Sequence, residues 1–212
     1  MVQTTKYIFS FTGASALIPE SLIVVEEFIR LKDWDAVETS LIDKNLLNKV
    51  KHATFKREFR EIKRRLVLLT DDQLYFLNLS SSDDTRAIIL LALVKSYSYL
   101  RDFIVDVIRS KYLLFETVLT DADYNRFFNS KCLTHPELTA LADVTAKKVK
   151  QLIFKLLEQV RLLSQVKDGT IIRLMLSDSV VELIIKDDPT LLTVFLYSNE
   201  EIKMILKKYN YV

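Results

Sequence analysis

Glycine occurs only twice in this chain of 212 residues, at Gly13 and Gly169, and proline occurs three times. Glycine supplies the positive-φ corners of tight turns and of phosphate-binding loops. A chain with so little glycine is poorly suited to an antiparallel β sandwich or to an α/β nucleotide-binding fold. Half of the residues are hydrophobic and 27% are charged, which is typical of a globular protein. We therefore expect an all-α, mainly helical fold.

Apolar residues recur at helical spacing along the chain. Segment 54–69 predicts a helix with one narrow apolar stripe, formed by Phe55, Phe59, Ile62, Leu66 and Leu69. Segment 145–163 predicts a second amphipathic helix with a wider apolar face. The run from Ala87 to Val94 is apolar on all sides and predicts the central buried helix of the fold. It is far shorter than the roughly 20 residues that a membrane span needs, so we expect no membrane contact.

Several helix starts can be predicted from capping residues. A Ser or Thr placed three residues before an acid or a glutamine is typical of a helix start. This spacing occurs at Thr70–Gln73, Thr120–Asp123, Thr134–Glu137 and Ser198–Glu201, and we expect Asp33 and Thr145 to cap further helices. Segment 85–115 predicts one long helix or two abutting ones, and Lys6–Phe11 predicts a short strand.

The strongest hairpin signal lies near the C-terminus. Asp168-Gly169 stands between two short β-prone runs in segment 164–176. Segment 137–176 then has the order of a winged helix-turn-helix, whose second helix enters the DNA major groove. We expect a helical bundle with helix-turn-helix-like segments and one small C-terminal β-hairpin wing. The predicted domains are an N-terminal helical domain (1–118) and a C-terminal winged-helix-like domain (119–212).

Basic residues are concentrated in two segments, although the net charge is only +2. Segment 51–66 has seven basic and two acidic residues, and segment 145–162 has five and one. Such clusters attract anionic partners, whereas a mixed-sign face would solubilise a protein equally well. The candidate DNA-binding residues lie off the apolar stripes and on the predicted wing: Lys56, Arg57, Arg60, Lys63, Arg64, Lys147, Lys148, Lys150, Gln151, Lys155, Lys167 and Arg173.

Catalytic and metal-binding patterns are missing from the sequence. Two histidines, His52 and His135, and the single Cys132 cannot build a structural zinc site of the usual kind. No glycine-rich phosphate loop or nucleophile elbow occurs, and helix capping accounts for the acidic pairs. We expect a non-enzymatic protein without cofactor or metal. One cysteine and no signal peptide indicate the cytoplasm.

The sequence resembles the BrxA family, small components of the BREX (bacteriophage exclusion) systems of bacteria. The resemblance spans nearly the whole chain and is most specific in the N-terminal block KYIFSFTGAS. It is carried by Lys6–Ser15, Asp33-Trp34, Asn45-Leu46-Leu47, Arg60-Glu61-Ile62, Arg64-Arg65-Leu66, Leu69-Thr70, Gln73-Leu74, Asp123-Tyr124, Phe127-Phe128, His135-Pro136-Glu137-Leu138, Gln151 and Phe154.

This resemblance implies a non-enzymatic, helical protein that binds double-stranded DNA and is encoded beside a methyltransferase and ATPases. It also implies a role in blocking phage replication. Two alternatives stay open: an RNA-binding antitermination-like factor, and a scaffold that docks acidic protein partners such as other BREX proteins. If the basic faces bind DNA, their many lysines predict weak sequence preference and strong salt dependence.

Overall fold

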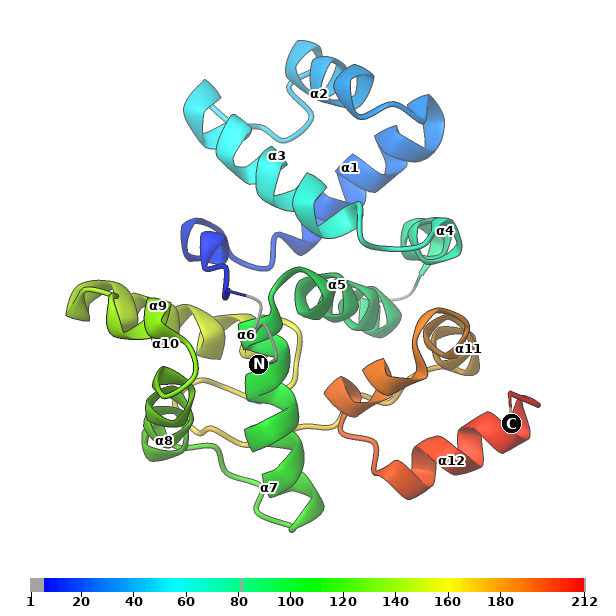
Figure 1. Cartoon of the computed structure of the whole chain (residues 1–212). Coiled ribbons are helices and arrows are strands. Elements are labelled where there is room, and N and C mark those ends of the chain that lie inside the picture. The colour runs from blue at the N-terminus through cyan, green and yellow to red at the C-terminus, as the bar shows by residue number, and fades with distance from the viewer. Residues whose placement is uncertain (1–5, 81, 212) are drawn as a thin grey trace.

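The structure is a computed structural model that describes residues 6–80 and 82–211. The N-terminal helices form the upper part in Figure 1, with the following bounds: η1 (Ser10–Gly13, a 3-10 turn), α1 (Ile18–Leu31), α2 (Trp34–Asp43), α3 (His52–Leu66), α4 (Asp71–Leu79) and α5 (Ser82–Ser96).

The second half of the chain lies below α5 in the same view. Its elements are α6 (Ser98–Phe103), a π-helical turn η2 (Ile104–Arg109), α7 (Ser110–Leu113), α8 (Asp121–Cys132), α9 (Pro136–Thr139), α10 (Asp143–Gln159), α11 (Asp178–Asp187), a 3-10 segment η3 (Pro189–Phe195) and α12 (Asn199–Lys208). The expectation of a mainly helical fold is confirmed.

Helix α5 is the centre of the hydrophobic core. Every residue from Ala87 to Val94 is buried, as its all-round apolar sequence predicts. The helix is interrupted at Tyr97, whose extended backbone separates α5 from the continuous helix made by α6, η2 and α7. Segment 85–115 therefore forms two abutting helices. Tyr97, Tyr99 and Phe103 are fully buried core residues.

Four of the six capping predictions are confirmed. Thr70, Thr120 and Ser198 form capping boxes with the residue three positions later, and the Asp33 carboxylate accepts from the amides of Asp35 and Ala36. The other two are wrong, because α9 begins at Pro136 and α10 begins at Asp143, each without a side-chain cap. Proline preorganises the first turn of α9, so no cap at Thr134 is needed.

The strand predicted at Lys6–Phe11 is also wrong. Residues 6–9 form no regular secondary structure, and a 3-10 turn begins at Ser10. Tertiary packing holds the segment instead. The Tyr7 ring stacks on His135 at 3.8 Å between centroids, and its hydroxyl donates to Asp102 at 2.7 Å.

The predicted C-terminal β-hairpin wing is wrong as well. Residues 160–176 contain only isolated antiparallel bridges, Val118 with Thr170 and Leu163 with Ile171. The segment that begins at Gly169 bonds to two different parts of the chain. Leu119 N donates to Gly169 O at 2.8 Å, and Ser164 N donates to Thr170 O at 2.9 Å. Leu163 and Ile171 are buried in the core, so this segment cannot protrude from the surface as a two-stranded hairpin.

The predicted domain boundary near residue 118 falls in the non-helical link between α7 and α8. Elements on either side of this link pack together: α10 contacts η1, and α11 contacts α5. The division into two domains stays a prediction.

Candidate nucleic-acid interface

Helix α3 has a buried apolar face and an exposed basic face. Phe55, Phe59, Ile62 and Leu66 are buried, as the stripe predicts. The exposed face carries Lys56, Arg57, Arg60 and Arg64. Lys63 is half-buried, with its Nζ 3.6 Å from Asp35 Oδ1 and 5.8 Å from the centre of the Trp34 ring.

Of the basic residues on this exposed face, only Arg64 lies near an acid of α3, with its Nε 3.9 Å from Glu61 Oε1. Glu58 pairs with Lys49 at 2.8 Å, and its hydrogen bond holds the pKa of that lysine above the ordinary value. Glu61 is buried and accepts a short hydrogen bond from the Tyr97 hydroxyl. Within the described chain, Lys56, Arg57 and Arg60 have no ion-pair partner within 4 Å. The exposed face of α3 is therefore strongly cationic.

Arg65 differs from its basic neighbours because it is 2% exposed. Its Nη1 donates to the carbonyls of Ser15 and Ala16 at 2.9 and 3.1 Å, and its Nη2 lies 3.9 Å from Glu61 Oε2. Arg65 thus fixes α3 against the segment that follows η1.

Helix α10 carries the second cationic face. Lys147, Lys148, Gln151 and Lys155 are exposed, opposite the buried Val149, Ile153 and Leu157. Lys150 is half-buried and pairs with Asp121 of α8 at 2.9 Å. The other three lysines have no ion-pair partner in the part of the chain that the structure describes.

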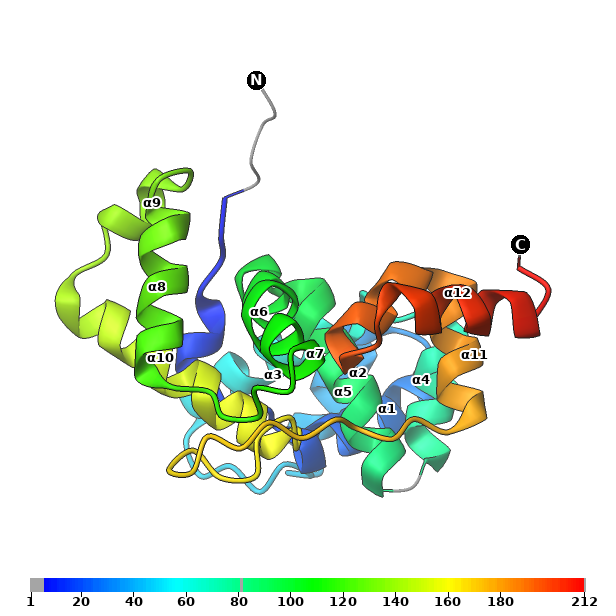
Figure 2. The same cartoon turned by 90° about the horizontal axis from the view of Figure 1, so that it is seen from below.

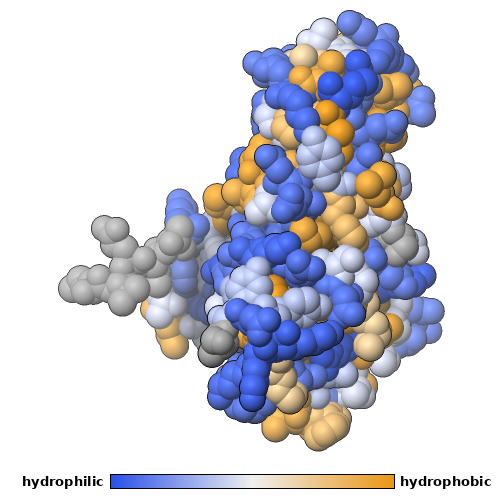
Figure 3. Space-filling view, turned by 90° about the vertical axis from the view of Figure 1, so that its right-hand side faces the viewer, coloured by the Kyte–Doolittle hydropathy of each residue, from blue (hydrophilic) through white to orange (hydrophobic). Residues whose placement is uncertain are grey.

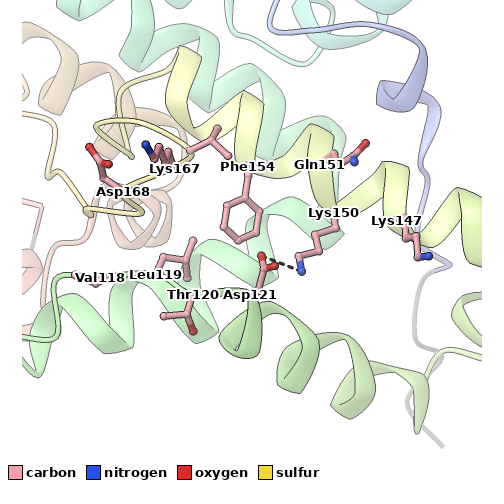
Figure 4. Close-up of a pocket in the computed structure, with 11 residues that line it drawn as sticks. Val118, Leu119, Thr120, Asp121, Lys147, Lys150, Gln151, Phe154, Lys167 and Asp168 are labelled. Carbon is pink, nitrogen blue, oxygen red and sulfur yellow. Dashed lines mark ion pairs between the residues drawn. The ribbon is translucent and has the colours of Figure 1, made fainter.

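One flank of α10 borders a cleft of about 590 Å³ (Figure 4). Residues 118–121 and the loop 166–168 form its other walls, and Phe154 lies at its apolar base. Of the predicted binding residues, Lys147, Lys150, Gln151 and Lys167 line this cleft. The cleft brings together a helix and two loops that lie apart in the sequence.

Arg173 lies in a different environment from the other candidates. Its Nη1 pairs with Glu201 of α12 at 2.8 Å, and its guanidinium lies 4.0 Å from the centre of the Tyr197 ring. Burial alone would lower the pKa of Arg173, but the hydrogen bond to Glu201 raises it. Arg173 therefore forms a structural ion pair that joins the segment before α11 to α12.

Sequence reasoning missed the walls contributed by residues 118–121. Their place is set by Gly169, whose φ of +63° and close approach to Leu119 bring the two loops together. Thr120 and Asp123 signalled a helix cap, and nothing in their local pattern indicated the loop opposite them.

The face that carries α11 and α12 contrasts with the two cationic helices. In Figure 3 hydrophilic residues separate the hydrophobic ones into small groups. Three of its lysines have acidic partners: Lys186 with Glu182, Lys203 with Glu200 and Lys208 with Asp178, at 2.7, 2.8 and 3.1 Å. Most of the positive charge on α11 and α12 is thus balanced locally.

Among residues 6–80 and 82–211, no group of three or more His, Cys, Asp or Glu side chains could hold a metal ion. None of the helices described is long and apolar enough to span a membrane.

Comparisons with known proteins place the chain in a family. A BrxA family model matches residues 5–188. A "BREX protein BrxA" from Bacillus cereus (strain H3081.97) is 28% identical over 69% of this chain and 74% of its own length. A protein of the same name from Escherichia coli O9:H4 (strain HS) is 22% identical over 75% of each chain.

A solved structure shares the fold. The crystal structure of an uncharacterized protein from Magnetospirillum magneticum superimposes with a TM-score of 0.78, at 18% identity, over 91% of this chain and 97% of that one. Because the family model covers most of the sequence, including every predicted binding residue, this chain belongs to the BrxA family of BREX proteins.

Proposed function

We propose that this protein is a non-enzymatic accessory component of a BREX phage-defence system that binds double-stranded DNA. The observation that carries the proposal is the exposed lysine and arginine of α3 and α10 without acidic partners. Phosphates on DNA would supply the missing counter-charges, and release of their condensed counterions would drive binding.

The proposed contacts are mainly to the DNA backbone. Lysines reach phosphates as point charges, whereas sequence reading needs forked or amide groups at base edges. Arg57, Arg60 and Gln151 are exposed groups of that second kind. We therefore expect limited sequence preference.

The first test is an anisotropy titration with a random-sequence duplex of about 30 base pairs at several salt concentrations. Log affinity should fall with log salt, at a slope of about −0.9 for each phosphate neutralised. Absence of binding at low salt would reject the proposal and direct attention to protein partners, including other BREX proteins. A matched RNA duplex that competes better than DNA would favour the antitermination-like alternative.

A triple substitution, Arg57→Glu, Arg60→Glu and Arg64→Glu, tests the site on α3. We expect binding to be lost, or the salt slope to fall by about 3, because each phosphate contact contributes about 1. Circular dichroism should be unchanged, since the three side chains are exposed.

The matched control is Lys186→Glu, Lys203→Glu and Lys207→Glu on α11 and α12, which changes the net charge equally. This control should lower affinity far less than the α3 triple substitution. Equal losses in the two variants would mean that overall charge, and not α3, determines binding.

A further inference from the structure

The turn η1 packs against both cationic helices. In Figures 1 and 2 it lies between α3 on one side and α10 on the other, and both helices contact it. The two basic segments, about 90 residues apart in the sequence, are therefore neighbours in the fold.

On the α3 side, the contact is made by an arginine of the exposed face. A Cβ built on Gly13 would lie 3.4 Å from Arg57 Cδ. Arg57 therefore lies against η1, and Arg64 lies two turns further along the same side of α3. Beneath them, the buried Arg65 binds the carbonyls of Ser15 and Ala16.

On the α10 side, Gln159 marks the flank that faces this segment. Its Oε1 accepts from the Ala16 amide at 2.9 Å. Lys155 is one turn before Gln159, and Lys148 is two turns before Lys155, so helical spacing places all three on one flank. Both lysines are exposed.

Residues 15–16 are thus bonded to α3 through Arg65 and to α10 through Gln159. These bonds fix the distance between the two helices. Arg57 and Arg64 of α3, and Lys148 and Lys155 of α10, are exposed residues on the two helices that contact η1. Like charges on neighbouring helices concentrate positive potential and favour a single extended anion over separate small ones.

We infer that α3, η1 and α10 form one continuous surface that a single DNA duplex spans, so that the two helices do not bridge two duplexes. The inference rests on the proposed function. A duplex carries one negative charge for about every 1.7 Å of its axis. Two duplexes seated on either side of one 3-10 turn would lie within about a Debye length, 8–10 Å, and would repel each other.

The stoichiometry is the first measurement. Titration of the full chain with a duplex of about 30 base pairs, followed by sedimentation velocity, should give one duplex for each protein molecule at saturation. Two duplexes bound to one protein would overturn the inference and leave the proposed function intact. A protein that binds no duplex would reject both.

The second measurement places a negative charge at Gly13, in the turn that both helices contact. Gly13 is exposed and its φ is outside the left-handed region, so it can accept a side chain. Gly13→Glu should weaken duplex binding about tenfold, because a carboxylate there opposes phosphates spanning both helices, whereas its neutral isostere Gly13→Gln should bind nearly as wild type.

Charge reversal on each helix completes the test. The α3 triple substitution and the pair Lys148→Glu with Lys155→Glu should each weaken the same binding event. Wild-type affinity in the Gly13→Glu variant, or a second duplex retained at full affinity after either charge reversal, would contradict a single surface.

Discussion

At the scale of single residues, Gly169 has a more restricted position than Gly13, the other glycine of the chain. Its φ of +63° is in the left-handed region, and an added Cβ would lie 2.2 Å from the carbonyl oxygen of Leu119. Gly169→Ala should lower the free energy of unfolding by about 2–4 kcal/mol, from backbone strain together with overpacking.

Chemical denaturation can measure this loss, with Gly13→Ala as the control. The Cβ added at Gly13 is at an ordinary contact distance and needs no unusual φ. Equal stability of the two alanine variants would show that the loop of residues 165–169 relaxes without cost.

Arg65 is the second residue whose environment makes a prediction. Arg65→Met removes the buried one of the two arginines that lie 3.9 Å from the buried Glu61, and it leaves the carbonyls of Ser15 and Ala16 without their donor. We expect a loss of about 3–5 kcal/mol, whereas Arg60→Met, at an exposed position on the same helix, should change stability by about 0.5 kcal/mol or less.

Adding Glu61→Gln to Arg65→Met should recover part of this loss, because a neutral amide at position 61 does not need the positive charge that Arg65 supplied. An additive double variant would show that the two residues act independently.

At the scale of elements, the first turn of α8 contains a buried acid, Asp123, whose ionised form stabilises that turn. Burial alone would raise the pKa of Asp123, but hydrogen bonds from Thr120 and Lys111 hold it below its ordinary value. The backbone amide and the hydroxyl of Thr120 both donate to Asp123 Oδ2 at 2.8 Å. The folded chain therefore binds this proton less readily than the unfolded chain does.

The direction of the pH effect follows from that difference. The contribution of Asp123 is complete above about pH 5, and it is lost as the pH falls through the depressed folded-state pKa. Asp123→Asn should be less stable than wild type at pH 7 by about 1–3 kcal/mol, and the two should converge near pH 2.

Thermal unfolding across this pH range measures the difference. Asp121→Asn, at an exposed position in the same turn, is the control and should have a small effect at every pH. A constant gap between wild type and Asp123→Asn from pH 7 to pH 2 would contradict the assignment.

Elements whose signals are local could be predicted from the sequence. The capping boxes at Thr70, Thr120 and Ser198 join residues three apart, and the buried run of α5 is contiguous. The predicted strand and wing failed because their outcome depends on distant partners. Tyr7 packs on His135, and Gly169 bonds to Leu119.

At the scale of the whole molecule, the candidate site also combines features that local sequence predicts with features that depend on distant partners. The charge clusters of α3 and α10 could be predicted by counting lysines and arginines. Their proximity could not, because it is made by η1, Arg65 and Gln159. The exposure of Lys148 and Lys155 follows from periodicity, whereas the pairing of Arg173 with Glu201 depends on where α12 docks.

The anchoring of the N-terminal segment also affects how the protein folds. Residues 6–16 are synthesised well before their partners, because the Tyr7 amide bonds to Glu137 and the Ala16 amide bonds to Gln159, 130 and 143 positions later. Contacts of such separation slow folding, because loop closure must precede them. The surface formed by α3, η1 and α10 is therefore completed only after Gln159 has been synthesised, and a chain truncated before this residue would lack it.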